Sequence, residues 1–214
     1  MSNFKKTLES LSQKHNITSI FDDFMEMSIC ALSNGNMEDE YNKVSKKYIP
    51  SEIEMLGNSL GYLLNEYEDL VKVGWDDILG NFFMQTNSGR DASAKGQFFT
   101  PKHICNLMSA VLNDKSKGMV CDPSCGSGRN LIANYHFNKD HLRVYIGMDL
   151  DKRCVNMTTL NMFFYSMDGI VIHMDSISNE VFSGYRVYLP TTFKGIQPLT
   201  KNQCLEYLLA IQRS

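Results

Sequence analysis

The sequence predicts an α/β protein in which a small helical domain precedes a domain built on a parallel sheet. Two observations support this prediction. Apolar residues recur at three- and four-residue steps through the first third of the chain, and after residue 100 short apolar runs alternate with helical segments. An order of strand, helix, strand, helix, strand predicts parallel strands with right-handed crossovers and a ligand at the carboxyl ends of the strands.

Composition limits the classes to which the chain can belong. Its 214 residues, 43% of them apolar, are typical of a folded chain with room for two small domains. No run approaches the roughly 18–20 apolar residues of a membrane span, and no export signal follows the N-terminus, so we expect a cytoplasmic protein without membrane contact. Six cysteines lack the paired spacing of zinc sites, which predicts reduced thiols and no metal.

Charge gives no direct evidence about nucleic acid. The formal net charge of −3 provides no overall attraction to phosphate. Any affinity for DNA therefore has to come from a local patch or from a partner subunit.

The N-terminal domain is expected to span residues 1–88. Phe21, Phe24, Met25 and Ile29 form one apolar stripe of a predicted helix. Residues 86–96 are polar, rich in small side chains and free of apolar periodicity, which is typical of a connection. We therefore place the second domain at residues 89–214.

The second domain is predicted to begin with a helix at residues 101–112, with Thr100 as its N-cap and Pro101 at its first position. Its predicted strands and helices then alternate: strand 118–121, helix 129–137, strand 144–148, helix 152–166 and strand 169–173.

A glycine-rich turn follows the first of these strands. Its residues are Asp122-Pro123-Ser124-Cys125-Gly126-Ser127-Gly128. Glycines let a ligand approach the backbone, and the following helix start presents N–H groups to an anion. The turn matches neither the triphosphate-binding GxxxxGK[ST] nor a full GxGxxG, because Leu131 stands where the third glycine would be. A simple strand-to-helix turn remains the alternative.

The next two strands also end in acids. Asp149 follows Asp122 by 27 residues and can accept hydrogen bonds from both hydroxyls of a ribose. Asp151 is expected to be the N-cap of the following helix, and Asp175 ends the third strand. A single acid at such a place is usually a capping residue, but three on successive strands indicate a site.

Three segments together resemble a known family. They are Gly96-Gln97-Phe98-Phe99-Thr100-Pro101, the turn from Asp122 to Gly128, and Gly147-Met148-Asp149-Leu150-Asp151 with Asn161. They resemble the N6-adenine DNA methyltransferases, above all the modification subunits of type I restriction-modification systems. The resemblance covers residues 77–176 and implies a Rossmann-like, S-adenosylmethionine-dependent methyltransferase domain.

The resemblance implies that S-adenosyl-L-methionine is the cofactor and assigns the residues that bind it. Its methionine end is expected at Phe99, Thr100, Pro101, Asp122, Pro123, Cys125, Gly126 and Gly128. Asp149 is expected to hold the ribose, Leu150 to pack on the adenine, and Asp175 with Ser176 to contact the adenine amino group. On this assignment, Asp149→Ala should abolish cofactor binding and leave the fold intact.

The half of the site that binds the methyl acceptor is not recognisable. Family members carry Asn-Pro-Pro-aromatic after a fourth strand, and no such motif occurs here. The nearest candidate follows a predicted strand at residues 185–189, but in it Pro190 is expected to end the strand and Phe193 to belong to the core. The catalytic residues are therefore unknown.

The C-terminal segment predicts an incomplete sheet. The 38 residues after Ser176 allow one strand and a closing helix at residues 199–212. We expect the open sheet edge to be covered by a second copy, another subunit or the N-terminal helices.

Three functions remain open on the sequence. The first is methyl transfer from S-adenosylmethionine to adenine N6 in DNA, by direct attack and without a metal or covalent enzyme intermediate. The second is a catalytically inactive cofactor-binding or assembly subunit of a methyltransferase or restriction-modification complex. The third is transfer to a different acceptor in a pocket around residues 185–193.

Overall fold

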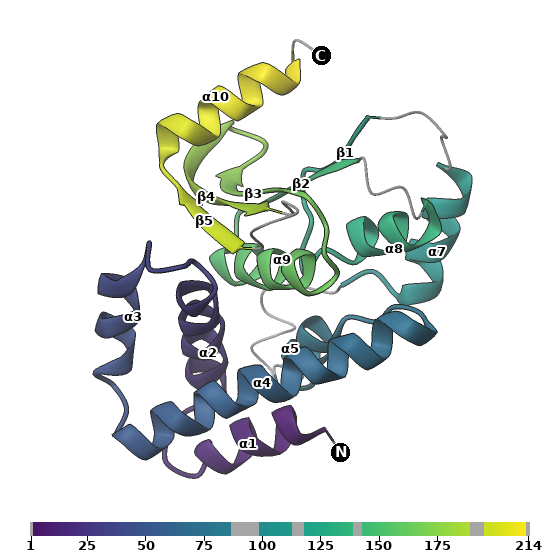
Figure 1. Cartoon of the computed structure of the whole chain (residues 1–214). Helices are drawn as coiled ribbons and strands as arrows, with labels where there is room; N and C mark the ends of the chain where they lie inside the picture. The colour runs from purple at the N-terminus through teal and green to yellow at the C-terminus, as the bar shows by residue number, and fades with distance from the viewer. Residues whose placement is uncertain (1, 87–98, 113–117, 139–142, 189–194, 213–214) are drawn as a thin grey trace. The chain divides into compact units, whose positions relative to one another are not determined.

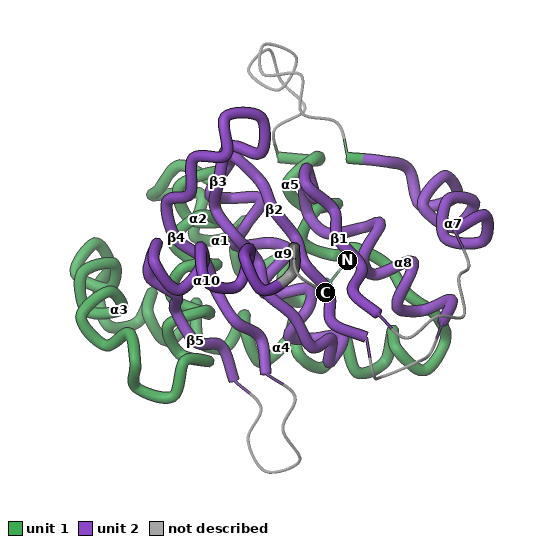
Figure 2. Tube along the Cα trace, turned by 90° about the horizontal axis from the view of Figure 1, so that it is seen from above, with its two compact units in different colours: residues 1–99 green, residues 100–214 purple. Residues whose placement is uncertain are grey.

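The structure is a computed structural model that describes residues 2–86, 99–112, 118–138, 143–188 and 195–212 (Figure 1). The chain divides into two compact units, Met1–Phe99 and Thr100–Ser214 (Figure 2). The domain boundary expected between residues 88 and 89 lies outside the described residues, as does most of the polar stretch 86–96.

The first unit is helical, as predicted. Its described helices are α1 (Asn3–Leu11), α2 (Ile17–Ala31), α3 (Glu38–Ser45), α4 (Pro50–Val73) and α5 (Ile78–Thr86). Asn16 caps α2, because its Oδ1 accepts the backbone N–H of Thr18 at 2.9 Å. The predicted stripe of Phe21, Phe24, Met25 and Ile29 is buried and forms part of this unit's core.

The second unit contains a five-stranded sheet in the order β1-β2-β3-β4-β5. The strands are β1 (Met119–Asp122), β2 (Val144–Asp149), β3 (Gly169–Asp175), β4 (Glu180–Tyr188) and β5 (Gly195–Leu199). The described helices are α7 (Lys102–Val111), α8 (Arg129–Asn138), α9 (Lys152–Phe164) and α10 (Lys201–Gln212). Elements predicted up to residue 175 therefore occur in the predicted order.

The strand directions confirm the α/β class and correct one detail. β1, β2 and β3 are parallel, as the alternating pattern predicts. β4 and β5 pair antiparallel to their neighbours. The expectation of a single strand after Ser176 is wrong, because a short turn at residues 176–179 joins β3 to β4 as a hairpin and β5 follows it.

Helices cover the two faces of the sheet differently. Ile146, Ile170 and Ile172 form one buried face, against which Tyr207 and Leu208 of α10 pack. On the other face Gly147 and Gly169 leave room for α9, since a Cβ at Gly169 would meet Met162 Cε at 2.4 Å. Helix α9 is buried from Cys154 to Phe164.

The part of the chain that the structure describes contains no helix both long enough and apolar enough to cross a membrane.

Candidate functional site

Three acids gather at one edge of the sheet. Asp122, Asp149 and Asp175 are the last residues of β1, β2 and β3. Because these strands are parallel, their carboxyl ends lie at the same edge. The tertiary structure therefore brings together the three acids that the sequence separates by more than fifty residues.

The glycine-rich turn folds back onto the end of β2. The backbone N–H of Gly126 donates to Asp149 Oδ2 at 2.9 Å, and the N–H of Cys125 donates to the Met148 carbonyl at 2.9 Å. Gly126 and Gly128 have φ angles of 56° and 86°, which glycine adopts without strain. The turn and Asp149 are thus one hydrogen-bonded unit.

Thr158 of α9 hydrogen-bonds to the glycine turn and packs against it. No motif in the sequence pointed to this residue. Its Oγ1 donates to the Gly126 carbonyl at 2.8 Å. A Cβ at Gly128 would lie 3.1 Å from both Thr158 Oγ1 and Cγ2, so the turn packs directly on this side chain. Asn161, one turn later, donates to the Ser127 carbonyl at 2.8 Å.

Asp149 is partly desolvated. Burial raises the pKa of its carboxyl group, while hydrogen bonds from the backbone N–H groups of Asp151 and Gly126 act in the opposite direction. The Asp151 N–H donates to Oδ1 at 2.9 Å. Each carboxylate oxygen has two lone pairs, so each can still accept a hydroxyl of a ribose.

Asp122 organises its own turn. Its Oδ1 accepts the Ser124 N–H at 3.1 Å, and its Oδ2 accepts the side-chain amide of Asn130 at 3.2 Å. Pro123 adds a link to β3, since its carbonyl accepts the Ser176 hydroxyl at 2.7 Å. These contacts join the predicted residues Asp122, Pro123 and Ser176 in one loop cluster.

Thr100 and Pro101 lead into α7, which starts at Lys102 with Pro101 as its N-cap. The expected N-cap role of Thr100 is therefore wrong, because Pro101 keeps an extended ψ of 143° and delays the helix by one residue. The Thr100 carbonyl accepts Arg129 Nη1 at 3.3 Å. Arg129 begins α8, so this contact ties the α7 entry to the end of the glycine turn.

Asp175 and Leu150 differ in their surroundings. Asp175 Oδ1 accepts the backbone N–H groups of Ile177 at 2.9 Å and Ser178 at 3.3 Å, which lower the pKa of its carboxyl group. Leu150 is 61% exposed directly after Asp149. An exposed apolar side chain at this edge offers a surface on which an adenine can pack.

His173 lies beside Leu150 and packs on Phe182, and neither His173 nor Phe182 was recognised as a site residue from the sequence. His173 Nε2 lies 3.0 Å from the Leu150 carbonyl, and the rings of His173 and Phe182 are 4.8 Å apart. The pairing of β3 with β4 shifts register between His173 and Met174. Such bulges re-aim side chains next to binding sites.

Cys125 and Phe99, which were both expected to bind the cofactor, have different surroundings from the other predicted residues. Cys125 is buried with its Sγ 3.4 Å from Thr158 Oγ1, so its side chain faces the interior and its backbone alone faces the turn. Burial raises the pKa of this thiol. Phe99 belongs to the first unit, where its ring lies 5.5 Å from that of Phe83, and the preceding residues 96–98 lie outside the described chain.

The segment expected to bind the methyl acceptor runs away from the edge of the sheet where the three acids lie. In β4, Glu180 pairs with Asp175 and Val187 pairs with Gly169, so the strand ends at Tyr188 beside the start of β3. At about 3.3 Å per residue this is roughly 20 Å from the acids. The described part of the acceptor pocket expected around residues 185–193 therefore lies toward the end of the sheet opposite the three acids. Residues 189–194 lie outside the described chain.

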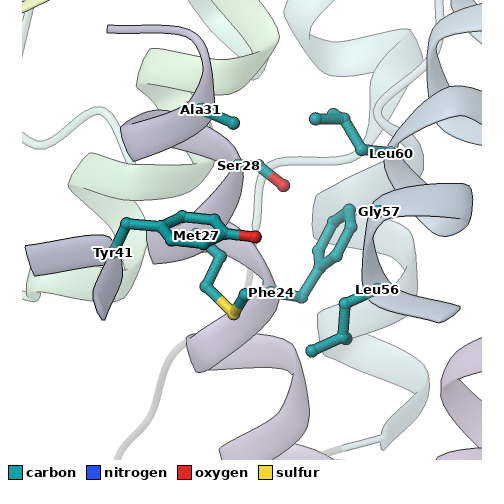
Figure 3. A pocket seen from close by; sticks show the side chains of 8 residues that line it. All are labelled: Phe24, Met27, Ser28, Ala31, Tyr41, Leu56, Gly57 and Leu60. Carbon is teal, nitrogen blue, oxygen red and sulfur yellow. The ribbon is translucent and has the colours of Figure 1, made fainter. Parts of the chain in front are cut away.

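A hollow in the helical unit is separate from this cluster (Figure 3). It is lined by Phe24, Met27, Ser28, Ala31, Tyr41, Leu56, Gly57 and Leu60 from α2, α3 and α4. It contains none of the predicted cofactor residues. Among the described residues there is also no group of three His, Cys, Asp or Glu side chains placed to hold a metal ion.

In open α/β folds ligands bind outside the carboxyl ends of the parallel strands, and the glycine turn and the three acids of this chain lie at that edge. The N-6 DNA Methylase family profile matches residues 75–192, more than half of the chain. The chain belongs to the N-6 DNA methylase family.

Curated relatives are restriction-modification proteins. The type II restriction enzyme and methyltransferase RM.BcgI of Heyndrickxia coagulans is 33% identical over 110 residues, 46% of this chain and 17% of its own length. The type I restriction enzyme MjaVII methylase subunit of Methanocaldococcus jannaschii is 23% identical over 198 residues, 85% of this chain and 32% of its own. The match therefore spans less than a third of either relative.

A solved structure is also similar. The methyltransferase subunit of the type I restriction-modification system from Streptococcus thermophilus has 19% sequence identity and a TM-score of 0.36, with 83% of this chain and 38% of that chain covered.

Proposed function

We propose that the chain binds S-adenosyl-L-methionine at the carboxyl edge of β1, β2 and β3 and takes part in methyl transfer to adenine N6 in DNA. The observation that carries this proposal is the hydrogen bond from the Gly126 N–H to Asp149 Oδ2, which joins the glycine turn to the acid of the next strand. Membership of the N-6 DNA methylase family supports both the cofactor and the acceptor.

The residues of the cluster fit the parts of this cofactor. Asp149 retains acceptor capacity for the ribose hydroxyls, and exposed Leu150 offers a face for the adenine. The turn from Asp122 to Gly128, with Thr100 and Pro101 beside α7, is assigned to the methionine end. Asp175 and Ser176 are assigned to the adenine amino group, and the bound cofactor supplies the methyl group.

A second candidate is a cofactor-binding or assembly subunit that transfers no methyl group by itself. The direction of β4 favours it, because this strand carries Tyr188 to the opposite end of the sheet from Asp122, Asp149 and Asp175. An acceptor base has to lie within near-attack distance of the donor, and misplacement costs orders of magnitude in rate. On this candidate DNA is contacted through a partner subunit of a restriction-modification complex.

One pair of measurements separates the two candidates. Calorimetric titration of the full chain with S-adenosylmethionine and S-adenosylhomocysteine measures binding, and tritium transfer to unmethylated duplex DNA measures catalysis. Binding with transfer supports the methyltransferase, and binding without transfer supports the subunit. If neither ligand binds at millimolar concentration, the cofactor proposal is wrong.

We also propose that the chain acts in the cytoplasm. None of its six cysteines forms a disulfide in the structure, which fits a reducing compartment.

A further inference from the structure

The peptide group between Leu150 and Asp151 is hydrogen-bonded on both of its sides. Its N–H belongs to Asp151 and donates to Asp149 Oδ1 at 2.9 Å. Its carbonyl belongs to Leu150 and lies 3.0 Å from His173 Nε2. A trans peptide group is planar, and its N–H and C=O point in opposite directions. One rigid group therefore connects the His173 ring to the Asp149 carboxylate.

The chemistry of the partner sets the protonation of the His173 ring. A carbonyl oxygen can only accept, so Nε2 carries the proton and donates to Leu150. Burial lowers the pKa of His173, and the ammonium group of Lys152 acts in the same direction. The bond to Leu150 and the charges of Asp151 and Asp149 act in the opposite direction. The net lowering of the pKa favours a neutral ring at neutral pH.

The sheet holds the His173 ring from two sides. His173 pairs with Asp149 in the register of β2 and β3, so both side chains lie on the same face of the sheet. The pairing of β3 with β4 shifts directly after His173. On the β4 side the ring packs against the uncharged ring of Phe182 at 4.8 Å. The imidazole is thus held by a hydrogen bond toward β2 and by ring packing toward β4.

We propose that His173 is a positioning residue for Asp149 and acts through the Leu150–Asp151 peptide group. Its Nε2–H holds the Leu150 carbonyl and thereby fixes the plane of this group, which aims the Asp151 N–H at Asp149 Oδ1. Hydrogen bonds in such a chain polarise one another, so the bond from His173 also makes the Asp151 N–H a stronger donor. His173 needs no contact with the cofactor for this role.

The consequence for the site rests on the proposed function. Asp149 is assigned to the ribose, and its two oxygens are fixed by the N–H groups of Asp151 and Gly126. With both bonds in place, the remaining lone pairs point in set directions toward the ribose hydroxyls. An acceptor that is already oriented costs less entropy when the ligand binds. Without His173 the carboxylate keeps its bond from Gly126, and the Leu150–Asp151 group is free to turn.

The pKa of Asp149 in the full chain without cofactor gives the first test. The Asp151 N–H lowers this pKa, so His173→Leu, which removes the donor, should raise it above the wild-type value. His173→Gln places an amide N–H near the position of Nε2 and should restore the wild-type value. His136→Leu is the control, because His136 lies in the last turn of α8, at the opposite end of this helix from the glycine turn. Carbon NMR of labelled aspartate carboxyl groups measures the pKa, and thermal unfolding checks that each variant folds.

Affinity for S-adenosylhomocysteine gives the second test. His173→Leu should weaken binding about three- to tenfold, the value of one net hydrogen bond, and His173→Gln should retain most of the affinity. His173→Leu should also move the loss of affinity at low pH to a higher pH, because Asp149 must be ionised to accept the ribose. In the Asp149→Asn background His173→Leu should weaken binding no further, because its effect passes through Asp149. Calorimetry of the single and double variants measures this coupling.

Three results would overturn the proposal: an unchanged Asp149 pKa in His173→Leu, equal pKa shifts in His173→Leu and His173→Gln, or additive losses of affinity in the double variant. The pKa measurement uses no ligand and therefore separates this proposal from the proposed function. A raised Asp149 pKa in a chain that binds no S-adenosylhomocysteine removes the cofactor proposal and leaves the role of His173 in place. Cofactor binding with an unchanged Asp149 pKa does the reverse.

Discussion

Both carboxylate oxygens of Asp149 accept backbone hydrogen bonds, one from Gly126 and one from Asp151. The side chain therefore holds the glycine turn as well as facing the expected ribose. The expectation that Asp149→Ala leaves the structure untouched has to be revised for this reason. Removing an acceptor from a partly buried N–H group costs about 1–3 kcal/mol.

We predict that Asp149→Ala loses cofactor binding and lowers the melting temperature, whereas Asp149→Asn loses most of the affinity with a smaller loss of stability. Asparagine keeps one carbonyl oxygen for a backbone N–H group but lacks the charge and the second acceptor. Calorimetry and thermal unfolding measure the two effects. Full cofactor affinity in both variants would remove Asp149 from the ribose site.

The pH dependence of cofactor affinity should follow Asp149. Burial raises the pKa of this carboxyl group above its usual value of 3.8. The ionised form accepts hydrogen bonds from the ribose hydroxyls. Cofactor affinity should therefore fall as the pH is lowered through the pKa of Asp149, which lies above 3.8. Titrations with S-adenosylhomocysteine at a series of pH values test this, and Asp149→Asn should flatten the profile.

Gly128 is a position in the turn where a side chain is poorly tolerated. Its φ is 86°, and a Cβ would approach Thr158 to 3.1 Å. We predict that Gly128→Ala destabilises the protein by about 1–3 kcal/mol through backbone strain and crowding. Gly118→Ala is the matched control, because a Cβ at Gly118 has no neighbour within 4 Å. Equal denaturation midpoints for the two variants would contradict this account.

At the scale of elements, Arg186 holds β4 against the start of β3. Its Nη1 donates to the Gly169 carbonyl at 2.7 Å and to the Val187 carbonyl at 2.6 Å, and its Nη2 lies 2.8 Å from Asp168 Oδ1. The side chain is 14% exposed. This fork fixes the antiparallel strand that turns residue 188 away from the candidate site.

We predict that Arg186→Ala lowers the free energy of unfolding by about 1.5–3 kcal/mol, since hydrogen bonds made by charged groups are lost together with a partly buried ion pair. Lys72→Ala, which removes the exposed Lys72–Asp69 pair, should leave stability unchanged. Urea denaturation of the two variants measures the difference. Similar midpoints would show that Arg186 does not hold β4.

At the scale of the whole molecule, the net charge of −3 bears on DNA binding. Phosphate contacts by Lys and Arg supply most nonspecific affinity for DNA. We predict that the full chain alone shows no saturable binding to unmethylated duplex DNA at about 0.15 M salt, and that its partner complex does. Fluorescence anisotropy at several salt concentrations measures both. Tight binding by the chain alone would contradict the need for a partner.

The sequence by itself determined the helical first unit, the order of strands and helices to residue 175, and the acids Asp122, Asp149 and Asp175 at the ends of β1, β2 and β3. These features depend on local patterns: apolar periodicity, glycines that permit positive φ, and acids placed at strand ends. Asp151 as the N-cap of α9 was predicted correctly for the same reason.

Only the tertiary structure decided the direction of β4, the hydrogen bond between Gly126 and Asp149, the support from Thr158, and the bond from His173 to the Leu150 carbonyl. Each depends on contacts between residues far apart in the chain, or on which strands lie beside one another. No local pattern encodes such neighbours, because a strand shows the same alternation whether its partner is parallel, antiparallel or absent.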